Sequence, residues 1–192
     1  MQIISVINQK GGVGKTTTVI NLAAGLSQLS KKILVIDLDP QGNATTGLGL
    51  SNTDNSSDTI YGVLNGTKEI ESVIKNTQFE NLDIITSNVD LSGLEVETAD
   101  DSNRAFILKT KLTSYLNNFR GSYDYVLIDC PPSLSLLTVM ALVSSNSLLV
   151  PLQTEFFALE GLTQLMKTIE RIKANLNPEL EIQGILLTMY DR

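Results

Sequence analysis

A glycine-rich stretch near the start of the chain places the strongest constraint on its fold. Residues 9–17 read QKGGVGKTT, between an apolar run at 2–8 and a run of helical apolar spacing that begins at Thr16. Glycines permit the positive φ angles with which consecutive backbone N–H groups turn inward, and the dipole of the following helix adds partial positive charge there. A strand that leads through such a loop into a helix predicts a cradle for a polyphosphate.

The side chains of this loop indicate how a nucleotide would be held. Lys15 is expected to reach the β- and γ-phosphates, and the Thr16 hydroxyl to bind the accompanying Mg²⁺. The pattern departs from the ordinary one, which would require glycine where this chain has Gln9, and it adds a second lysine, Lys10. The residues expected to hold the phosphates are Gly11, Gly12, Val13, Gly14, Lys15, Thr16 and Thr17.

Composition narrows the class of protein. The chain has 192 residues, enough for one domain, with 42% hydrophobic and 18% charged residues. It contains one cysteine, Cys130, and no histidine, which excludes an internal disulfide, imidazole catalysis and most zinc sites. No apolar run approaches the roughly 20 residues that span a bilayer, and no signal peptide is visible, so we expect a cytoplasmic protein. The net charge of −7 does not suggest a nucleic-acid binder, and the weak lysine pairs at 31–32 and at 109 and 111 are typical of solvated surface.

Strand and helix patterns alternate along the chain. Buried strands are expected at 2–8, 32–37, 82–86, 125–129, 148–150 (closed by Pro151) and 182–188. Helices are expected at 16–29, 59–64, 70–74, 105–119, 136–143 and 159–176, and the polar run at 51–58 predicts an exposed loop. This alternation predicts an α/β fold of the P-loop NTPase type, with a mainly parallel twisted sheet and helices on both faces.

Three aspartates follow or end buried strands, where α/β sheets place their ligands. Asp129 ends the strand at 125–129 in the manner of a Walker B motif, and we expect it to hold a metal-bound water. Asp39 leaves the strand at 32–37, and beside a γ-phosphate it could orient the attacking water. The role of Asp37 is ambiguous from sequence alone.

Five motifs occur together and in order. They read KGGVGKTT at 10–17, DLDPQGNAT at 37–45, LIDCPPSL at 127–134, VPLQTEFFALEG at 150–161 and GILLTMYD at 184–191. In this order they resemble ParA proteins of the chromosomal (Soj) type, within the ParA/MinD superfamily that carries a deviant Walker A motif. The resemblance runs from the first residue to the last, and the second and fourth motifs narrow it to partition ATPases.

The resemblance implies an ATP-driven switch in DNA segregation. Family members dimerise around two ATP molecules, bind DNA nonspecifically as dimers, and are released when a ParB-type partner stimulates hydrolysis. By position, Lys10 would be the signature lysine that reaches the partner's ATP, Lys15 and Thr16 the phosphate and Mg²⁺ contacts, Asp39 the hydrolysis residue and Asp129 the Walker B carboxylate. A nucleoid-associated, cytoplasmic homodimer is therefore expected.

The family normally continues past the point where this chain ends. We therefore interpret residues 1–192 as a single ATPase domain without the family's C-terminal part. Family members use arginines near and beyond this end to grip DNA. Asp191 and Arg192 adjoin here, where the family usually has one residue between them, so no DNA role is assigned to Arg192.

Three other functions are considered. A MinD-like division-site ATPase would bind membranes through a basic amphipathic helix, and none is visible in this sequence. A metabolic ligase or nitrogenase-reductase-like enzyme is disfavoured, because the latter needs cluster cysteines and the chain has only Cys130. A noncatalytic nucleotide-binding scaffold is opposed by the presence of Lys15, Thr16, Asp39 and Asp129.

Overall fold

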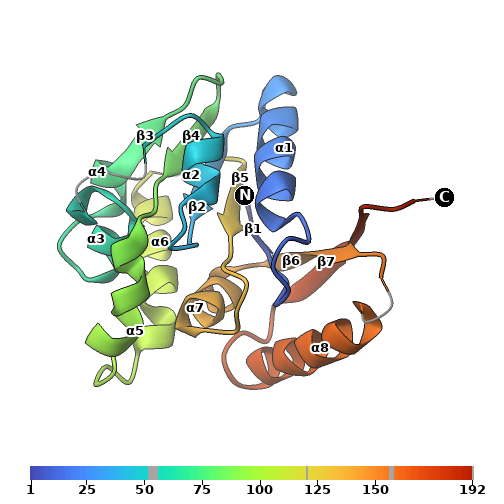
Figure 1. Ribbon diagram of the computed structural model, residues 1–192. Coiled ribbons are helices and arrows are strands. Elements are labelled where there is room, and N and C mark those ends of the chain that lie inside the picture. The colour runs from blue at the N-terminus through green and yellow to red at the C-terminus, as the bar shows by residue number, and fades with distance from the viewer. Residues whose placement is uncertain (52–55, 120, 156–157, 192) are drawn as a thin grey trace.

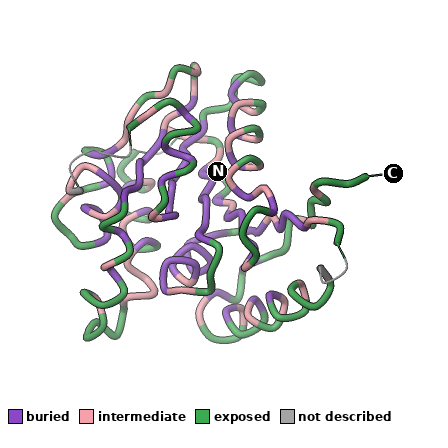
Figure 2. The backbone as a smooth tube through the Cα atoms, in the orientation of Figure 1, coloured by how far each residue is buried: buried purple, intermediate pink, exposed green. Residues whose placement is uncertain are grey.

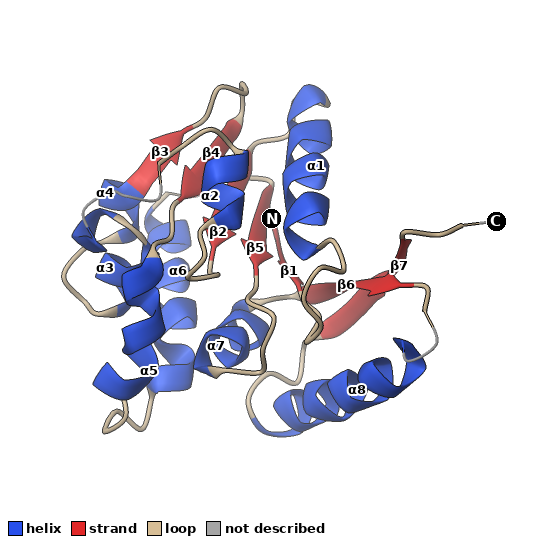
Figure 3. Ribbon diagram, in the orientation of Figure 1, coloured by secondary structure: helices blue, strands red, loops and turns tan. Residues whose placement is uncertain are grey.

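The computed structural model describes residues 1–51, 56–119, 121–155 and 158–191. These residues form a layered α/β structure in which a central sheet separates two groups of helices (Figures 1 and 3). Residues 52–55 of the expected loop at 51–58, residues 156–157 of the fourth motif and Arg192 lie outside the described residues.

The sheet has the strand order β3-β4-β2-β5-β1-β6-β7. The strands are β1 (Gln2–Val6), β2 (Ile33–Asp37), β3 (Ile74–Asn76), β4 (Leu82–Ile85), β5 (Tyr125–Asp129), β6 (Ser147–Gln153) and β7 (Glu181–Thr188). All neighbouring pairs are parallel except β3 and β4, which are antiparallel at one edge. The mainly parallel sheet predicted from sequence is confirmed, and the carboxyl ends of β1, β5 and β2 lie in register at one edge of the sheet.

Helices cover both faces of the sheet. The α-helices are α1 (Lys15–Gln28), α2 (Asn43–Gly47), α3 (Ile60–Leu64), α4 (Ile70–Val73), α5 (Leu94–Glu97), α6 (Ile107–Asn118), α7 (Leu136–Ser144) and α8 (Ala158–Asn175). Short 3₁₀ turns are η1 (Ser56–Asp58), η2 (Val89–Gly93) and η3 (Arg104–Phe106). On one face α1 packs through Val19 and Ala23 onto alternate strand residues, and the larger core on the other face includes residues of α3, α6, α7 and α8. Figure 2 shows the buried residues concentrated along the central strands between these layers.

Two sequence expectations about element ends are wrong. Ile74 was expected to end a helix over 70–74, but the helix ends at Val73 and Ile74 pairs with Ile85 of β4. Pro151 was expected to close a strand, but β6 continues through it to Gln153 while paired to β7. The ladder between β1 and β6 ends at Leu149, so no bond to β1 is lost by the missing N–H of proline.

Candidate functional site

The glycine-rich loop joins β1 to α1 at the carboxyl end of the sheet. Val6 is in register with Asp129 at the end of β5, and Asp129 is in register with Asp37 at the end of β2. Because parallel strands end at the same edge of a sheet, the loop and the two strand-end carboxylates are brought together there. The central strands therefore explain why residues from three separate motifs meet.

The loop conformation depends on two of its glycines. Gly12 and Gly14 have φ angles of 75° and 91°, in the left-handed region that side chains with a Cβ rarely adopt. Gly14 is the N-cap of α1, and no side chain caps that helix. The first backbone N–H groups of α1 are thus left for a ligand, and the helix dipole favours an anionic one.

An open cavity of about 450 Å³ lies over the loop. Seven of the residues predicted from sequence line it, namely Gly11, Gly12, Gly14, Lys15, Thr16, Thr17 and Asp39. Lys10, Val13 and Asp129 do not line it. The cavity also contacts Gln41, Asn43, Pro132 and Met189, which the sequence reasoning did not single out. Gln41, Asn43 and Pro132 lie within the second and third motifs and Met189 lies within the fifth, but the sequence predicted no individual role for any of them.

Lys15 is a buried cation at the base of the cavity. It is 7% exposed, and its Nζ donates to the carbonyl oxygen of Lys10 at 3.0 Å. Burial lowers the pKa of Lys15, while the nearby carboxylates of Asp129 and Asp39 act in the opposite direction. A partly desolvated ammonium group is a strong attractor for a polyphosphate.

Asp129 ends β5, does not line the cavity and is fully buried. Among the described residues, neither of its carboxylate oxygens has a hydrogen-bond partner. Burial raises its pKa to about 8, and Asp37 and Asp39 add to the rise, while Thr16 and Lys15 oppose it. Buried carboxylates are normally paired, so two unpaired oxygens on a carboxylate whose pKa the Thr16 side chain lowers fit the outer ligand shell of a hydrated Mg²⁺.

The described residues contain no cluster of three or more His, Cys, Asp or Glu side chains that could hold a metal by themselves. Mg²⁺ is commonly bound by one or two protein oxygens together with substrate phosphates, and it keeps several waters. The donors at this site, a hydroxyl and a carboxylate beside a phosphate cradle, suit that mode of binding.

The geometry separates the two aspartates that follow β2. Asp37 accepts from the Asp39 N–H at 3.2 Å and from the N–H and hydroxyl of Thr45 at 2.8 and 2.7 Å. Asp39 lines the cavity and accepts from the Gln41 N–H at 3.0 Å. Asp37 therefore holds the loop together, and Asp39 is the carboxylate that faces a ligand.

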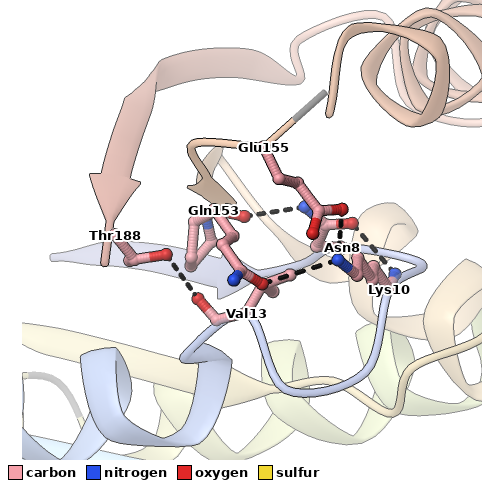
Figure 4. A network of polar contacts seen from close by, with 7 residues as sticks. Asn8, Lys10, Val13, Gln153, Glu155 and Thr188 are labelled. Carbon is pink, nitrogen blue, oxygen red and sulfur yellow. Dashed lines mark hydrogen bonds and ion pairs between the residues drawn. The ribbon is translucent and has the colours of Figure 1, made fainter. Parts of the chain in front are cut away.

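Lys10 points away from the nucleotide cavity of its own chain. Its Nζ forms an ion pair with Glu155 and lies 3.5 Å from Oε1 of Gln153, both beyond or at the end of β6 (Figure 4). Its backbone N–H donates to Oδ1 of Asn8 at 3.0 Å, and Asn8 in turn donates to the carbonyl of Pro151 at 2.7 Å. The Lys10 side chain is 48% exposed, so it is accessible to another molecule.

The buried carboxyls predict a pH-dependent stability. In the unfolded chain both ionise near 3.8, whereas burial raises the pKa of Asp37 to about 6 and that of Asp129 to about 8. Between these values the folded chain binds more protons than the unfolded chain, so its free energy of unfolding falls as the pH rises. We expect the melting temperature, measured without nucleotide or Mg²⁺, to decrease from a pH of about 5 to about 8.

Asp129→Asn is expected to flatten that decrease, since it removes the carboxyl with the larger shift. Asp100→Asn, at an exposed position, is the matched control and should keep the wild-type slope. A wild-type slope in Asp129→Asn would contradict the assignment. Differential scanning calorimetry at several pH values provides the measurement.

Comparison of the sequence with those of known proteins identifies the family to which the chain belongs. A family model described as an AAA domain matches residues 1–182. The chromosome partitioning protein ParA of Caulobacter vibrioides (strain NA1000 / CB15N) is 50% identical over 192 residues, which are 100% of this chain and 71% of that protein. The sporulation initiation inhibitor protein Soj of Bacillus subtilis is 46% identical over 190 residues, or 99% of this chain and 73% of Soj.

Solved structures share the fold of this chain. A cobyrinic acid a,c-diamide synthase of Mycobacterium smegmatis, with bound ADP and magnesium, is 37% identical, and its TM-score is 0.91 over 100% of this chain and 76% of that one. A plasmid partition protein of Borrelia burgdorferi is 30% identical, and its TM-score is 0.82 over 100% of this chain and 80% of that one. Matches of this extent and identity, together with the P-loop geometry, show that the chain belongs to the ParA/Soj family of chromosome-partitioning ATPases.

Proposed function

We propose that this chain is an ATP-dependent dimerisation switch in chromosome segregation. In its ATP state it binds DNA nonspecifically, and a ParB-type centromere-binding protein stimulates hydrolysis and release. The observation that carries this proposal is the convergence of Lys15, Thr16 and Asp39 around one cavity, with the buried Asp129 at the end of the strand beside β1. The greater identity to chromosomal ParA, 50% against 30% for the plasmid partition protein, favours a chromosome as cargo.

ATP is the proposed nucleotide and Mg²⁺ the proposed metal. Lys15 and the backbone N–H groups of the loop and of α1 would hold the β- and γ-phosphates. Thr16 would bind Mg²⁺ directly and Asp129 through a water; when bound, the ion would neutralise phosphate charge. The solved Mycobacterium smegmatis structure with ADP and magnesium, and a Borrelia burgdorferi partition protein bound to AMPPNP, support this choice.

Asp39 is proposed as the residue that orients the water for attack on the γ-phosphate. It faces the cavity, and its backbone is fixed through Asp37 and its side chain through the Gln41 N–H. A carboxylate in that place can accept a hydrogen bond from the attacking water. Slow intrinsic turnover is proposed as well, since a switch must remain in its ATP state for some time.

Lys10 is proposed as the signature lysine that crosses to the nucleotide of a second copy. In the single chain it contacts Glu155 and Gln153 and does not line its own cavity. Its exposure leaves the ammonium group free to move to a partner's phosphates, since a surface ion pair is worth only about 1 kcal/mol or less. On dimerisation the Lys10 ammonium group would therefore leave Glu155 and Gln153 and bind the phosphates of the partner's nucleotide.

The dimer proposal predicts that Lys10→Ala stays monomeric with ATP while it still binds the nucleotide. Glu155→Gln is the matched control, because it removes the same ion pair from the other side and leaves the lysine in place. We expect Glu155→Gln to dimerise with ATP at least as well as the wild type. Light scattering after size-exclusion chromatography, with ATP, ADP or neither, measures both. ATP-dependent dimers of Lys10→Ala would refute the crossing role, and a wild type that stays monomeric with bound ATP would refute the switch.

Other functions of the superfamily are less well supported. In the part of the chain that the structure describes, no helix is long and apolar enough to span a membrane. We propose a nucleoid-associated cytoplasmic location over a MinD-like role at the membrane. The synthase of Mycobacterium smegmatis raises a metabolic alternative, but its identity of 37% is below the 50% of chromosomal ParA.

A further inference from the structure

The end of β7 is hydrogen-bonded to the P-loop. Oγ1 of Thr188, the last residue of that strand, donates to the carbonyl oxygen of Val13 at 2.8 Å. The two residues are 175 positions apart in the sequence, and Figure 4 shows the threonine directed at this carbonyl. The contact is partly buried, where a hydrogen bond is less exposed to competition from water. It thus joins the nucleotide loop to a strand outside the P-loop motif.

The Val13 carbonyl belongs to the peptide that precedes Gly14. None of the described peptides is cis, and in a planar trans peptide the C=O and N–H groups point in opposite directions. A hydrogen bond that draws the carbonyl toward β7 therefore directs the Gly14 N–H away from β7. Gly14 lines the cavity and is the N-cap of α1, so this N–H is placed among those that face an anion.

Gly14 is one of the two loop glycines with a positive φ angle, and it is the one that Thr188 approaches. Its φ of 91° is accessible to glycine at little steric cost, so the residue itself restrains the backbone weakly. A Cβ built on Gly14 would lie 3.6 Å from Cγ2 of Thr188, which shows how closely the threonine approaches it. Thr188 thus supplies both a hydrogen bond and a packing surface at the flexible point.

Thr188 is itself held in place. It pairs with Gln153 of β6, and its carbonyl accepts from the Thr154 N–H at 3.4 Å. The start of the loop is held separately by Asn8, whose side-chain amide donates to the carbonyl oxygen of Pro151 in β6. The ends of β6 and β7 therefore hold the loop at its start and at its end, and the Thr188 contact is the one nearer to α1.

We propose that Thr188 is a positioning residue for the ATPase reaction. Its hydroxyl fixes the Val13–Gly14 peptide so that the Gly14 N–H is presented to the phosphates of the nucleotide. Thr188 does not line the cavity and acts through the loop. This inference rests on the proposed nucleotide site and extends it to a strand that the P-loop motif does not include.

The test compares two substitutions in the whole chain. Thr188→Val keeps the shape and the β-branching of the side chain but loses the hydroxyl, whereas Thr188→Ser keeps the hydroxyl. Loss of one hydrogen bond should weaken Mg·ATP binding about tenfold in Thr188→Val, and Thr188→Ser should stay within about twofold of the wild type. We expect KM for ATP to rise with kcat nearly unchanged. Isothermal titration calorimetry with Mg·ATP and steady-state kinetics give these values.

A purely structural role would give another pattern. In that case Thr188→Val would lower the melting temperature of the nucleotide-free chain and leave its affinity for ATP equal to that of Thr188→Ser. Should Thr188→Val fail to fold, Thr188→Ala replaces it, since it also lacks the hydroxyl. Binding of ATP by the hydroxyl-free variant as tight as that of Thr188→Ser overturns the inference. A wild type without affinity for ATP would overturn the nucleotide site as well, which distinguishes the two failures.

Discussion

Replacement of Lys15 by alanine is expected to weaken ATP binding by about a hundredfold and to remove measurable ATP turnover. The side chain is buried at the base of the cavity, and burial lowers its pKa by favouring the neutral form. A polyphosphate offsets this desolvation cost, because its negative charge attracts the ammonium group strongly in a site with little water. Truncating one partner of such a buried pair typically costs about 2–5 kcal/mol, which spans the predicted change in affinity.

Lys31→Ala is the matched control for this prediction, since Lys31 is an exposed lysine that lies outside the cavity. It should bind and hydrolyse ATP like the wild type. Equilibrium binding of a fluorescent ATP analogue and a phosphate-release assay measure the two effects. Affinity of Lys15→Ala within about threefold of the wild type would show that the phosphates do not lie at this cradle.

Asp39→Ala is expected to keep ATP binding and to lose at least about a hundredfold in turnover. The carboxylate faces the cavity, and the hydrogen bond described for it is to the Gln41 N–H and not to the glycine-rich loop. Positioned general bases typically contribute about 10²–10⁴ to a rate, so their removal affects kcat far more than affinity. With hydrolysis blocked, the ATP-bound dimer should accumulate.

Asp39→Asn separates shape from charge at this position. Asparagine can still accept from the Gln41 N–H, so the loop should keep its conformation. We expect the same loss of turnover as in alanine, with ATP affinity unchanged. Retained turnover in both variants would refute the role of Asp39, and hydrolysis lost with ATP binding preserved would exclude a noncatalytic scaffold.

The strands and the long helices were predictable because they are specified locally. The continuous apolar runs that became β2 and β5 predict burial on both faces, and α1 and α8 follow helical spacing. The P-loop was predictable for a related reason, since its glycines are required by the backbone angles themselves. That residues 1–192 form a single ATPase domain without the family's C-terminal part stays a prediction.

What the sequence did not predict depends on contacts between distant residues. The short helix α2 and the turns around η2 and α5 were not expected; α2 includes Thr45, whose N–H and hydroxyl bond Asp37. The role of Asp37 was likewise ambiguous in the sequence, because its bonds to Thr45 and to the Asp39 N–H form only in the folded loop, whereas Asp39 was expected beside a ligand and does line the cavity.

The supports of the P-loop were equally invisible in the sequence. Glu155 lies beside Lys10, and Thr188 bonds Val13, only because β6 lies beside β1 and β7 lies beside β6 in the folded sheet. The hydrophobic pattern of the sequence predicts that such strands exist, but it does not predict which strands are neighbours in the sheet. Residues that act through this order can therefore be found only from the structure.

The most direct measurement is binding of the chain to nonspecific duplex DNA with ATP, with ADP and without nucleotide, over a range of salt concentrations. A switch should bind in the ATP state alone, with affinity that falls as salt rises, and Lys15→Ala should lose the binding. The net charge of −7 makes a dependence on the nucleotide state all the more informative, since DNA should not be attracted to the chain as a whole. Binding of equal strength in all three states, or none by a chain that binds ATP, would contradict an ATP-dependent DNA switch within these residues.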